Sequence, residues 1–352
     1  MARAPKQVEF EPDEDLPVRA NPDLFGHHAA AAALEAAARS GRLPHAWLVC
    51  GPPGIGKATL GYRFARWLLA GGPDLPAMSG APPLHLPADH PVFRRVAAAS
   101  HADLRPLRPV ADGRVNKEIR VDAVRAAIRF LGMTPAEGAW RFVLVDEAEA
   151  MRPEAANALL KTLEEPPPRA VLMLTTAAPD RLLPTIRSRC RRLELEPLAE
   201  ADMSALLARL RPELGGADRA RLATVAEGSP GRAIALAEGE GLAVQQLVER
   251  ALAGLAAGDR REWHALADAV AAKRDGSSFT TFIALLRREI SAATRRAARG
   301  GQVPAWLGLR PLAEWTTLWD SLGRLAAETD GLSLDRKQAV LTALGWLTPP
   351  RR

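Results

Sequence analysis

The sequence feature that most constrains the fold of this chain is a glycine-rich segment at residues 51–59, Gly-Pro-Pro-Gly-Ile-Gly-Lys-Ala-Thr. Residues 51–57 match the phosphate-binding loop pattern G-x-x-x-x-G-K-[ST], in which backbone N–H groups and a lysine surround a polyphosphate at a helix N-terminus. The pattern requires a strand before the loop and a helix after it, and residues 46–50 are an apolar strand candidate. Apolar residues then recur at helical spacing, namely Leu60, Phe64, Trp67 and Leu68. The sequence therefore predicts a strand–loop–helix unit.

The loop departs from this pattern at Ala58. The pattern has a Ser or Thr at that position, because its hydroxyl holds the magnesium ion of the bound nucleotide. Thr59 comes one residue later, which on a helix is a rotation of about 100° away from the nucleotide. We therefore expect the loop to bind ATP or ADP with magnesium only weakly. The candidate nucleotide contacts in this loop are Gly51, Gly54, Gly56, Lys57 and Thr59.

A second motif follows where the hydrophobic run at residues 141–145 ends in Asp146 and Glu147. In proteins with a phosphate-binding loop, such a pair places one carboxylate beside the magnesium ion and the other where it polarises the attacking water. We interpret Asp146 as a carboxylate of the nucleotide site and Glu147 as a weak or vestigial general base. The helix predicted next, at residues 154–165, is stopped by three prolines, and residues 170–175 are the following buried strand.

Polar residues end this last strand. Thr175 and Thr176 lie at the edge where open α/β sheets bind their ligands. Thr175 is therefore either a contact to the γ-phosphate of a nucleotide or a simple cap between strand and loop. The arginine-rich run at residues 187–192 leaves three alternatives: a solvated face, a nucleic-acid patch or, for Arg189, a rigid guanidinium presented to a neighbour's phosphate.

Composition limits the class of the protein and its compartment. The chain has 352 residues, enough for two or three domains, and its net charge of +6 is only a mild indication of an acidic partner such as nucleic acid. Two cysteines, Cys50 and Cys190, are too few for a disulfide framework or a four-cysteine zinc site. No run of about 18 apolar residues could span a membrane, and the N-terminus is not a signal peptide. These features indicate a cytoplasmic protein that does not enter a membrane.

The order of the elements predicts a parallel-sheet α/β domain of the P-loop type followed by helices alone. Residues 1–20 are charged, contain prolines and are expected to be a flexible tail. Residues 71–115 have no sustained period and are interpreted as an insertion on the surface. A helical pattern resumes at residues 117–131, and everything after Pro197 is predicted to be helical, with Ser229 as a helix N-cap.

Together these motifs resemble those of the delta-prime subunits of bacterial DNA polymerase III clamp loaders, a family of the AAA+ class. The resemblance spans roughly residues 24–347. It depends most on residues 157–167 (Asn-Ala-Leu-Leu-Lys-Thr-Leu-Glu-Glu-Pro-Pro), on Ser188-Arg189-Cys190 and on residues 334–338 (Leu-Asp-Arg-Lys-Gln). The first two motifs are shared with the ATPase subunits of the family, and their combination with Ala58 points to the delta-prime type.

The resemblance implies three domains and a catalytic role in a neighbouring subunit. An AAA+ or RecA-like nucleotide-binding domain is expected at residues 21–197, a helical lid at 198–240 and a helical collar that assembles a ring at 241–352. In that family the arginine of the Ser-Arg-Cys motif reaches into the ATP site of the adjacent subunit as an arginine finger, and Arg189 occupies its place. The partners implied are delta-type and tau/gamma-type subunits in a hetero-oligomeric ring and, through that complex, the sliding clamp and primer-template DNA.

The sequence departs from the family pattern in two places. Many relatives bind zinc through four cysteines after the phosphate-binding loop, whereas residues 71–115 contain no cysteine, so no zinc is expected. Their ATPase subunits place a lid arginine directly after a Gly-Ser-x triplet. Here Gly228-Ser229-Pro230 is followed by Gly231, and Arg232 comes one position later. A phosphate-sensing role is therefore not assigned to Arg232.

Three hypotheses of function remain. The leading one is a stator subunit that helps to load the sliding clamp onto primed DNA during replication, is no ATPase on its own, requires no cofactor and supplies Arg189 in trans. The alternative is a competent AAA+ clamp-loader ATPase, because Lys57, Asp146 and Glu147 are present and Thr59 or a water could replace the missing hydroxyl. A sequence-specific DNA-binding protein is the weakest, since no helix-turn-helix, zinc-finger or aromatic-stacking motif is found.

Overall fold

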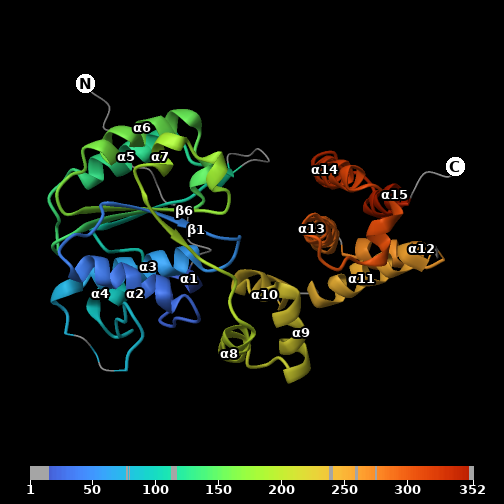
Figure 1. Ribbon diagram of the computed structural model, residues 1–352, viewed down its shortest axis with the longest axis horizontal. Coiled ribbons are helices and arrows are strands. Elements are labelled where there is room, and N and C mark those ends of the chain that lie inside the picture. Colours follow the sequence, from blue (N-terminus) through green and yellow to red (C-terminus); the bar gives the residue numbers. More distant parts are fainter. Residues whose placement is uncertain are drawn as a thin grey trace. The chain divides into compact units, whose positions relative to one another are not determined.

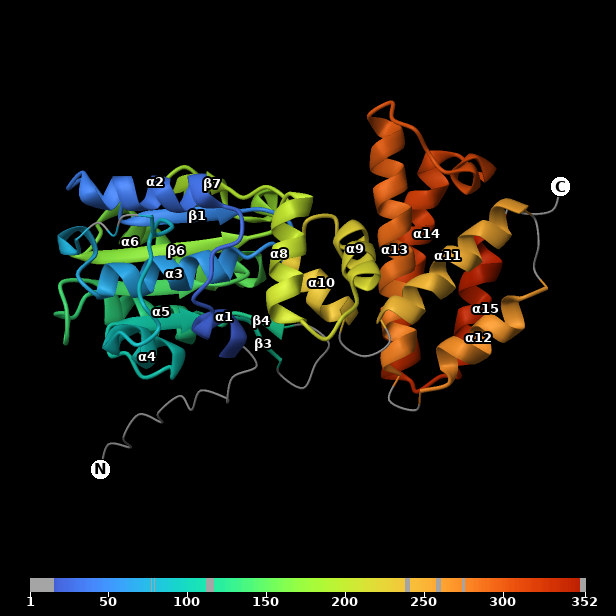
Figure 2. The same cartoon turned by 90° about the horizontal axis from the view of Figure 1, so that it is seen from below.

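The computed structural model describes residues 16–76, 78, 80–111, 117–237, 241–257, 261–273 and 276–348. The chain divides into two compact units, Met1–Ala233 and Ile234–Arg352, and the division falls inside helix α10 (Pro230–Ala237) (Figures 1 and 2). The finer division into a lid at 198–240 and a collar at 241–352 stays a prediction.

The first unit contains a five-stranded parallel sheet with the strand order β2-β5-β6-β1-β7. Every residue of the three inner strands is buried, as in parallel sheets that are covered on both faces. These strands are the apolar runs recognised in the sequence, so the predicted parallel α/β fold is confirmed. The strands are β1 (Ala46–Cys50), β2 (Leu104–Leu107), β5 (Arg141–Val145), β6 (Ala170–Thr176) and β7 (Arg191–Glu194), and a separate antiparallel pair is formed by β3 (Val110–Ala111) and β4 (Lys117–Glu118).

Helices cover both faces of this sheet (Figure 1). One face carries α1 (Leu16–Ala20), α2 (His28–Arg39), α3 (Lys57–Leu69) and α4 (Pro91–Ala97), and the other carries α5 (Val121–Leu131), α6 (Pro153–Glu164) and α7 (Pro184–Arg187). Helix α3 lies close to the sheet because Gly61 leaves room for it: a Cβ there would lie 2.8 Å from a side-chain atom of Leu144. The short 3-10 helices are η1 (Gly72–Asp74), η2 (Ala148–Ala150) and η3 (Pro179–Arg181).

Two sequence interpretations of the first unit were wrong. Residues 71–115 are not only a surface insertion, because they contain α4 with its buried Phe93 and the sheet strand β2. Strand β2 reads Leu-Arg-Pro-Leu and has no apolar run because it lies at the edge of the sheet. The helix expected from residue 117 begins at Val121 instead, after strand β4.

The flexible tail predicted at residues 1–20 was wrong for residues 16–20. Residues 1–15 lie outside the described part of the chain, whereas residues 16–20 form α1, in which Arg19 is buried. Two buried arginines of α3 hold this segment: Arg66 donates to the carbonyl oxygens of Arg19 and Asn21, and Arg63 donates to those of Pro22 and Pro83. Burial lowers the pKa of both guanidinium groups to about 10.

Helices α8 (Glu200–Leu210) and α9 (Gly216–Ala226) pack on each other and complete the first unit. The described residues of the second unit form helices only, as predicted for this part of the chain. They are α11 (Gly241–Ala257), α12 (Trp263–Ala271), α13 (Ser277–Ala298), η4 (Ala305–Leu309), α14 (Leu312–Gly331) and α15 (Arg336–Leu347). In the Leu-Asp-Arg-Lys-Gln motif, Asp335 accepts a hydrogen bond from the Gln338 N–H at the start of α15, and Lys337 pairs with Asp268 of α12.

Candidate functional site

The phosphate-binding loop connects the carboxyl end of β1 to the first residue of α3. Gly54 and Gly56 have φ angles of 71° and 106°, which a side chain would strain. The strand, the loop and the helix are therefore arranged as a polyphosphate site requires.

Lys57 is bound by its own loop. Its Nζ donates hydrogen bonds of 2.9 Å each to the carbonyl oxygens of Gly51 and Pro52, and the residue is 8% exposed. Burial lowers the pKa of the Lys57 amine, while Glu149, Asp146 and Glu147, in that order, act in the opposite direction. Two of the three N–H donors of this amine, the group that would contact a phosphate, are thus bonded to backbone carbonyls.

The acidic pair after β5 is joined to the end of β6. The Thr175 hydroxyl, which is fully buried, donates to Asp146 Oδ1 at 2.5 Å and accepts a hydrogen bond of 3.2 Å from the Glu147 N–H. Glu147 itself is exposed and has a left-handed backbone with φ of 52°. Thr175 therefore orients the pair, a role that neither alternative from the sequence had anticipated; the γ-phosphate contact stays a prediction.

Glu149 is a further member of this site that sequence reasoning missed. It lies in η2, and its Oε1 accepts a hydrogen bond of 2.8 Å from the Ala177 N–H just after β6. It is also the carboxylate with the largest effect on the pKa of Lys57. Its spacing of two residues from Glu147 was the available indication, because a strand that ends in several acids concentrates negative charge at one edge.

Residues 229–231, before and within α10, contact the phosphate-binding loop directly. The Ser229 hydroxyl donates to the Pro53 carbonyl at 3.0 Å, and the Gly231 N–H donates to the Gly54 carbonyl at 2.8 Å. A Cβ at Gly231 would lie 3.0 Å from the Gly54 Cα, so only a glycine fits there without displacement. The Ser229 hydroxyl, expected to cap its own helix, instead binds the loop.

The Arg232 side chain is paired with a carboxylate near this contact. Its Nη1 lies 3.4 Å from Glu227 Oε2. The residue directly after the Gly-Ser-x triplet is Gly231, whose backbone N–H donates to the Gly54 carbonyl of the loop.

Arg189 lies at the opposite edge of the sheet from this loop. Strands β1 and β7 are parallel with Trp47 beside Arg191 and Cys50 beside Glu194, so the residues before β7 lie near the amino end of β1. The loop follows the carboxyl end of β1, four residues further along the strand, which is about 13 Å. Arg189 therefore cannot complete the site of its own chain.

The Arg189 side chain is 34% exposed and is held by two acceptors. Its Nη2 lies 2.7 Å from Glu164 Oε1, and its Nη1 donates to the Thr185 carbonyl at 3.1 Å. Arg187, two residues earlier, is equally exposed at 35% and pairs with Asp180 at 2.9 Å.

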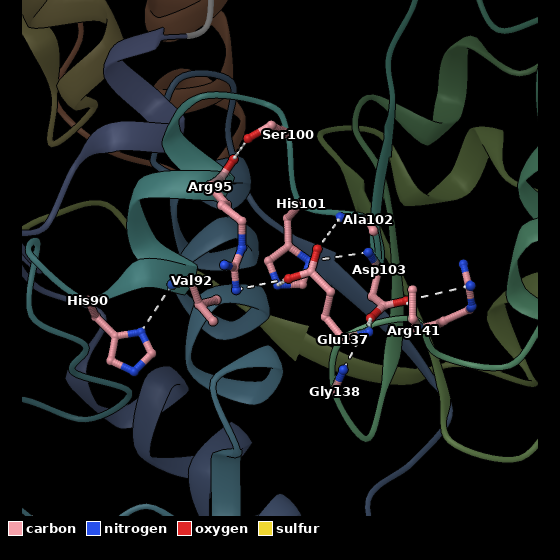
Figure 3. Close-up of polar contacts among 11 residues, drawn as sticks. His90, Val92, Arg95, Ser100, His101, Ala102, Asp103, Glu137, Gly138 and Arg141 are labelled. Atoms are coloured by element: carbon pink, nitrogen blue, oxygen red, sulfur yellow. Dashed lines mark hydrogen bonds and ion pairs between the residues drawn. The ribbon is translucent and has the colours of Figure 1, made fainter.

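The amino edge of the sheet also carries a buried polar cluster (Figure 3). Asp103, which precedes β2 and is fully buried, accepts hydrogen bonds from the N–H groups of Ala136, Glu137 and Gly138 and lies 3.6 Å from the Arg141 guanidinium. Burial alone would raise the pKa of the Asp103 carboxyl, but these N–H groups and Arg141 hold it below its ordinary value. The cluster fixes the connection from α5 to β5.

His101 packs beside this cluster and is buried, although it lies within residues 71–115, which were interpreted from the sequence as an insertion on the surface. Its Nδ1 accepts from the Asp103 N–H at 3.2 Å, and its Nε2 lies 3.8 Å from Glu137 Oε2. Burial lowers the pKa of His101, with Glu137 acting in the opposite direction. Among the residues that the structure describes, no group of three or more His, Cys, Asp or Glu side chains is placed to hold a metal ion.

The fold and the site define the class of the protein: a parallel-sheet α/β fold with a phosphate-binding loop. Within that class, residues 26–199 match the family model described as DNA polymerase III, delta subunit, and the chain belongs to this family.

Individual relatives agree with this assignment. The chain is similar to DNA polymerase III subunit delta' of Pseudomonas aeruginosa, with 39% identity over 186 residues that cover 53% of each chain. It is similar to subunit delta' of Escherichia coli, with 35% identity over 236 residues that cover 66% of each chain. It also resembles DNA polymerase III subunit gamma/tau of Mycobacterium bovis, with 33% identity over 196 residues, which are 55% of this chain and 31% of the relative. The matches thus span about half to two thirds of the delta' relatives.

None of the helices in the described ranges has the length and apolar character needed to cross a bilayer.

Proposed function

We propose that this chain is the delta-prime, or stator, subunit of a DNA polymerase III clamp loader, in which Arg189 completes the ATP site of an adjacent subunit. The observation that carries the proposal is the location of Arg189 at the sheet edge opposite its own phosphate-binding loop. A partly exposed guanidinium that cannot serve its own site is available to a neighbour's site.

The chemistry of such a role is electrostatic. Negative charge develops on the transferred phosphoryl group and its leaving oxygen, and a guanidinium with several N–H donors stabilises that charge. Arginine fingers contribute about 10³–10⁵ to turnover in other phosphoryl-transfer systems. A subunit can therefore be essential for ATP turnover without turning over ATP itself.

Three features of the chain's own site support weak or absent activity there. Ala58 removes the hydroxyl that would hold magnesium. Lys57 is engaged by the carbonyls of Gly51 and Pro52, and the lid segment is hydrogen bonded to the same loop. If ATP or ADP with magnesium binds weakly, Lys57, the loop N–H groups and Asp146 are the residues that would hold it.

The wider role is proposed on the same grounds. As a delta-prime subunit the chain would join delta-type and tau/gamma-type subunits in a hetero-oligomeric ring in the cytoplasm, and through that ring it would act on the sliding clamp and primer-template DNA. The relatives named delta' and gamma/tau support membership of such a complex.

A competent ATPase is the alternative function. Two observations favour it: Lys57, Asp146 and Glu147 are all present at one edge of the sheet, and the chain is similar to a gamma/tau subunit. ATP hydrolysis by the isolated chain separates the two, with Lys57→Ala as the control. Turnover that depends on Lys57 would establish the ATPase and remove the stator proposal.

The proposal is tested by Arg189→Ala in the complex reconstituted with delta-type and tau/gamma-type partners. Turnover at the ATP site that adjoins this subunit should fall about 10³-fold or more, measured with the other sites silenced in the partners. Arg187→Ala is the matched control, since Arg187 is equally exposed and lies in the same turn. Unchanged turnover with Arg189→Ala would reject the role.

A further inference from the structure

The motif at residues 157–167 has no part in the function proposed above, although it is one of the most specific features of the sequence. Most of it lies in α6, which ends at Glu164. Its apolar members Leu159 and Leu163 are buried against the sheet, which accounts for them as core residues. Glu164 is 52% exposed at the side chain, so packing does not account for it.

The position of Glu164 is electrostatically unfavourable for a helix. It is the last residue of α6, where the unpaired carbonyls give the helix end a partial negative charge. A carboxylate at that end is repelled, whereas a cation is attracted. The Arg189 guanidinium, 2.7 Å from Glu164 Oε1, supplies that cation.

The contacts of Arg189 leave it able to serve a neighbour. A guanidinium has five N–H donors in a planar fork. One terminal nitrogen pairs with Glu164 and the other donates to the Thr185 carbonyl, so both have acceptors within this chain. The remaining donors of the fork stay available for phosphate oxygens.

We propose that Glu164 is the positioning residue of the arginine finger. The inference rests on the function proposed for Arg189 and adds a residue to it. An arginine side chain loses considerable rotamer freedom when it is fixed. If Arg189 is already fixed before the reaction, this loss of entropy does not add to the free energy of the transition state. Glu164 and Thr185 together fix the plane of the guanidinium before the neighbouring subunit presents its nucleotide.

This role links the two motifs that the chain shares with ATPase subunits of the family. The helix of residues 157–167 supplies the carboxylate, and the Ser188-Arg189-Cys190 segment supplies the guanidinium. The presence of both motifs in one chain then has a physical reason, because the carboxylate of the first orients the guanidinium of the second.

The test is a double-mutant cycle on the reconstituted complex, with ATP turnover measured at the adjoining site. Glu164→Ala should lower kcat about tenfold and leave KM unchanged, because the finger acts in the transition state rather than in substrate binding. Glu164→Gln keeps an oxygen acceptor without the charge and should lose less, about threefold. In an Arg189→Ala background, Glu164→Ala should have no additional effect.

Glu165→Ala is the matched control. Glu165 is the exposed neighbour, and in the described part of the chain its carboxylate has no hydrogen bond or ion pair. Thermal unfolding of each variant excludes a loss of folding, since an exposed ion pair contributes little to stability.

The outcomes are distinguishable. Turnover of Glu164→Ala within twofold of the unmodified complex, a rise in turnover, or an additional loss in the Arg189→Ala background would overturn the positioning role while leaving the finger intact. If Arg189→Ala itself has no effect, the proposed function fails, whatever Glu164 does.

Discussion

The two edges of the parallel sheet differ in how their polar groups are used. At the carboxyl edge, two groups that would bind a nucleotide are engaged by the chain itself: Lys57 by the carbonyls of its loop and Asp146 by Thr175. At the amino edge, Arg189 is held by Glu164 and the Thr185 carbonyl but its side chain remains 34% exposed. A P-loop fold can therefore keep the architecture of a nucleotide site while the partly exposed guanidinium of Arg189 lies at the other edge of the sheet.

The largest effect on stability is expected at the amino edge, from Asp103→Ala. The change leaves three backbone N–H groups without their acceptor and removes the carboxylate paired with the buried Arg141 guanidinium, which keeps only its hydrogen bonds to the Thr134 carbonyl. The free energy of unfolding should fall by about 3–5 kcal/mol, measured by chemical denaturation. Asp122→Ala, which removes an exposed pair with Arg125, should change it by less than about 0.5 kcal/mol. Equal effects of the two would show that the cluster does not support this edge.

The same carboxyl predicts the pH dependence of stability. The folded-state pKa of Asp103 lies below its ordinary value because backbone N–H groups and Arg141 outweigh the effect of burial. The contribution of Asp103 to the free energy of unfolding is therefore complete above the pKa of this carboxyl in the unfolded chain, about 3.9. It is lost as the pH falls through the lower pKa of the folded state. Unfolding measured across this range should show a loss at acid pH that Asp103→Asn reduces; an unchanged profile would argue against the assignment.

At the carboxyl edge, the contact between residues 229–231 and the phosphate-binding loop is tested by Gly231→Ala. The added Cβ would lie 3.0 Å from the Gly54 Cα, so α10 or the loop must move, at a cost of about 1–3 kcal/mol. Hydrogen exchange of the Gly231 segment and of the phosphate-binding loop should become faster. Gly216→Ala is the control, because nothing lies within 4 Å of its added Cβ. Unaltered exchange in Gly231→Ala would show that the contact is not tight.

The smallest effect is expected from Ala58→Thr, which restores the magnesium hydroxyl. Magnesium-dependent binding of ATP by the chain should strengthen about tenfold, the equivalent of one modest metal contact. Ala58→Val has the same shape without the hydroxyl and should not bind more tightly. If both variants or neither strengthen binding, the hydroxyl is not what the loop lacks.

The sequence predicted the fold correctly where the residues of a single strand or a single loop are enough to identify that element. The inner strands β1, β5 and β6 are continuous apolar runs, and the phosphate-binding loop is a local pattern. Edge strand β2 was missed because an arginine and a proline interrupt its apolar residues in Leu-Arg-Pro-Leu. Helix α1 was missed because it is held by Arg66, which lies in a helix far along the chain.

The site was predictable in its residues but not in their pairing. Arg189, Lys57 and Asp146 follow from motifs, yet nothing local connects Thr175 to Asp146 or Glu164 to Arg189. Those pairs join different strands and helices, and only the fold brings them together. Glu149 was overlooked for the same reason, since its partner at Ala177 lies beyond the next strand.

The most direct measurement compares the two edges in one assay: ATP turnover by the reconstituted complex that contains either Lys57→Ala or Arg189→Ala. The account predicts that Lys57→Ala retains the turnover of the unmodified complex, while Arg189→Ala loses the turnover of the adjoining site. Loss of turnover with Lys57→Ala together with unchanged turnover for Arg189→Ala would contradict it, because the working site would then be the chain's own.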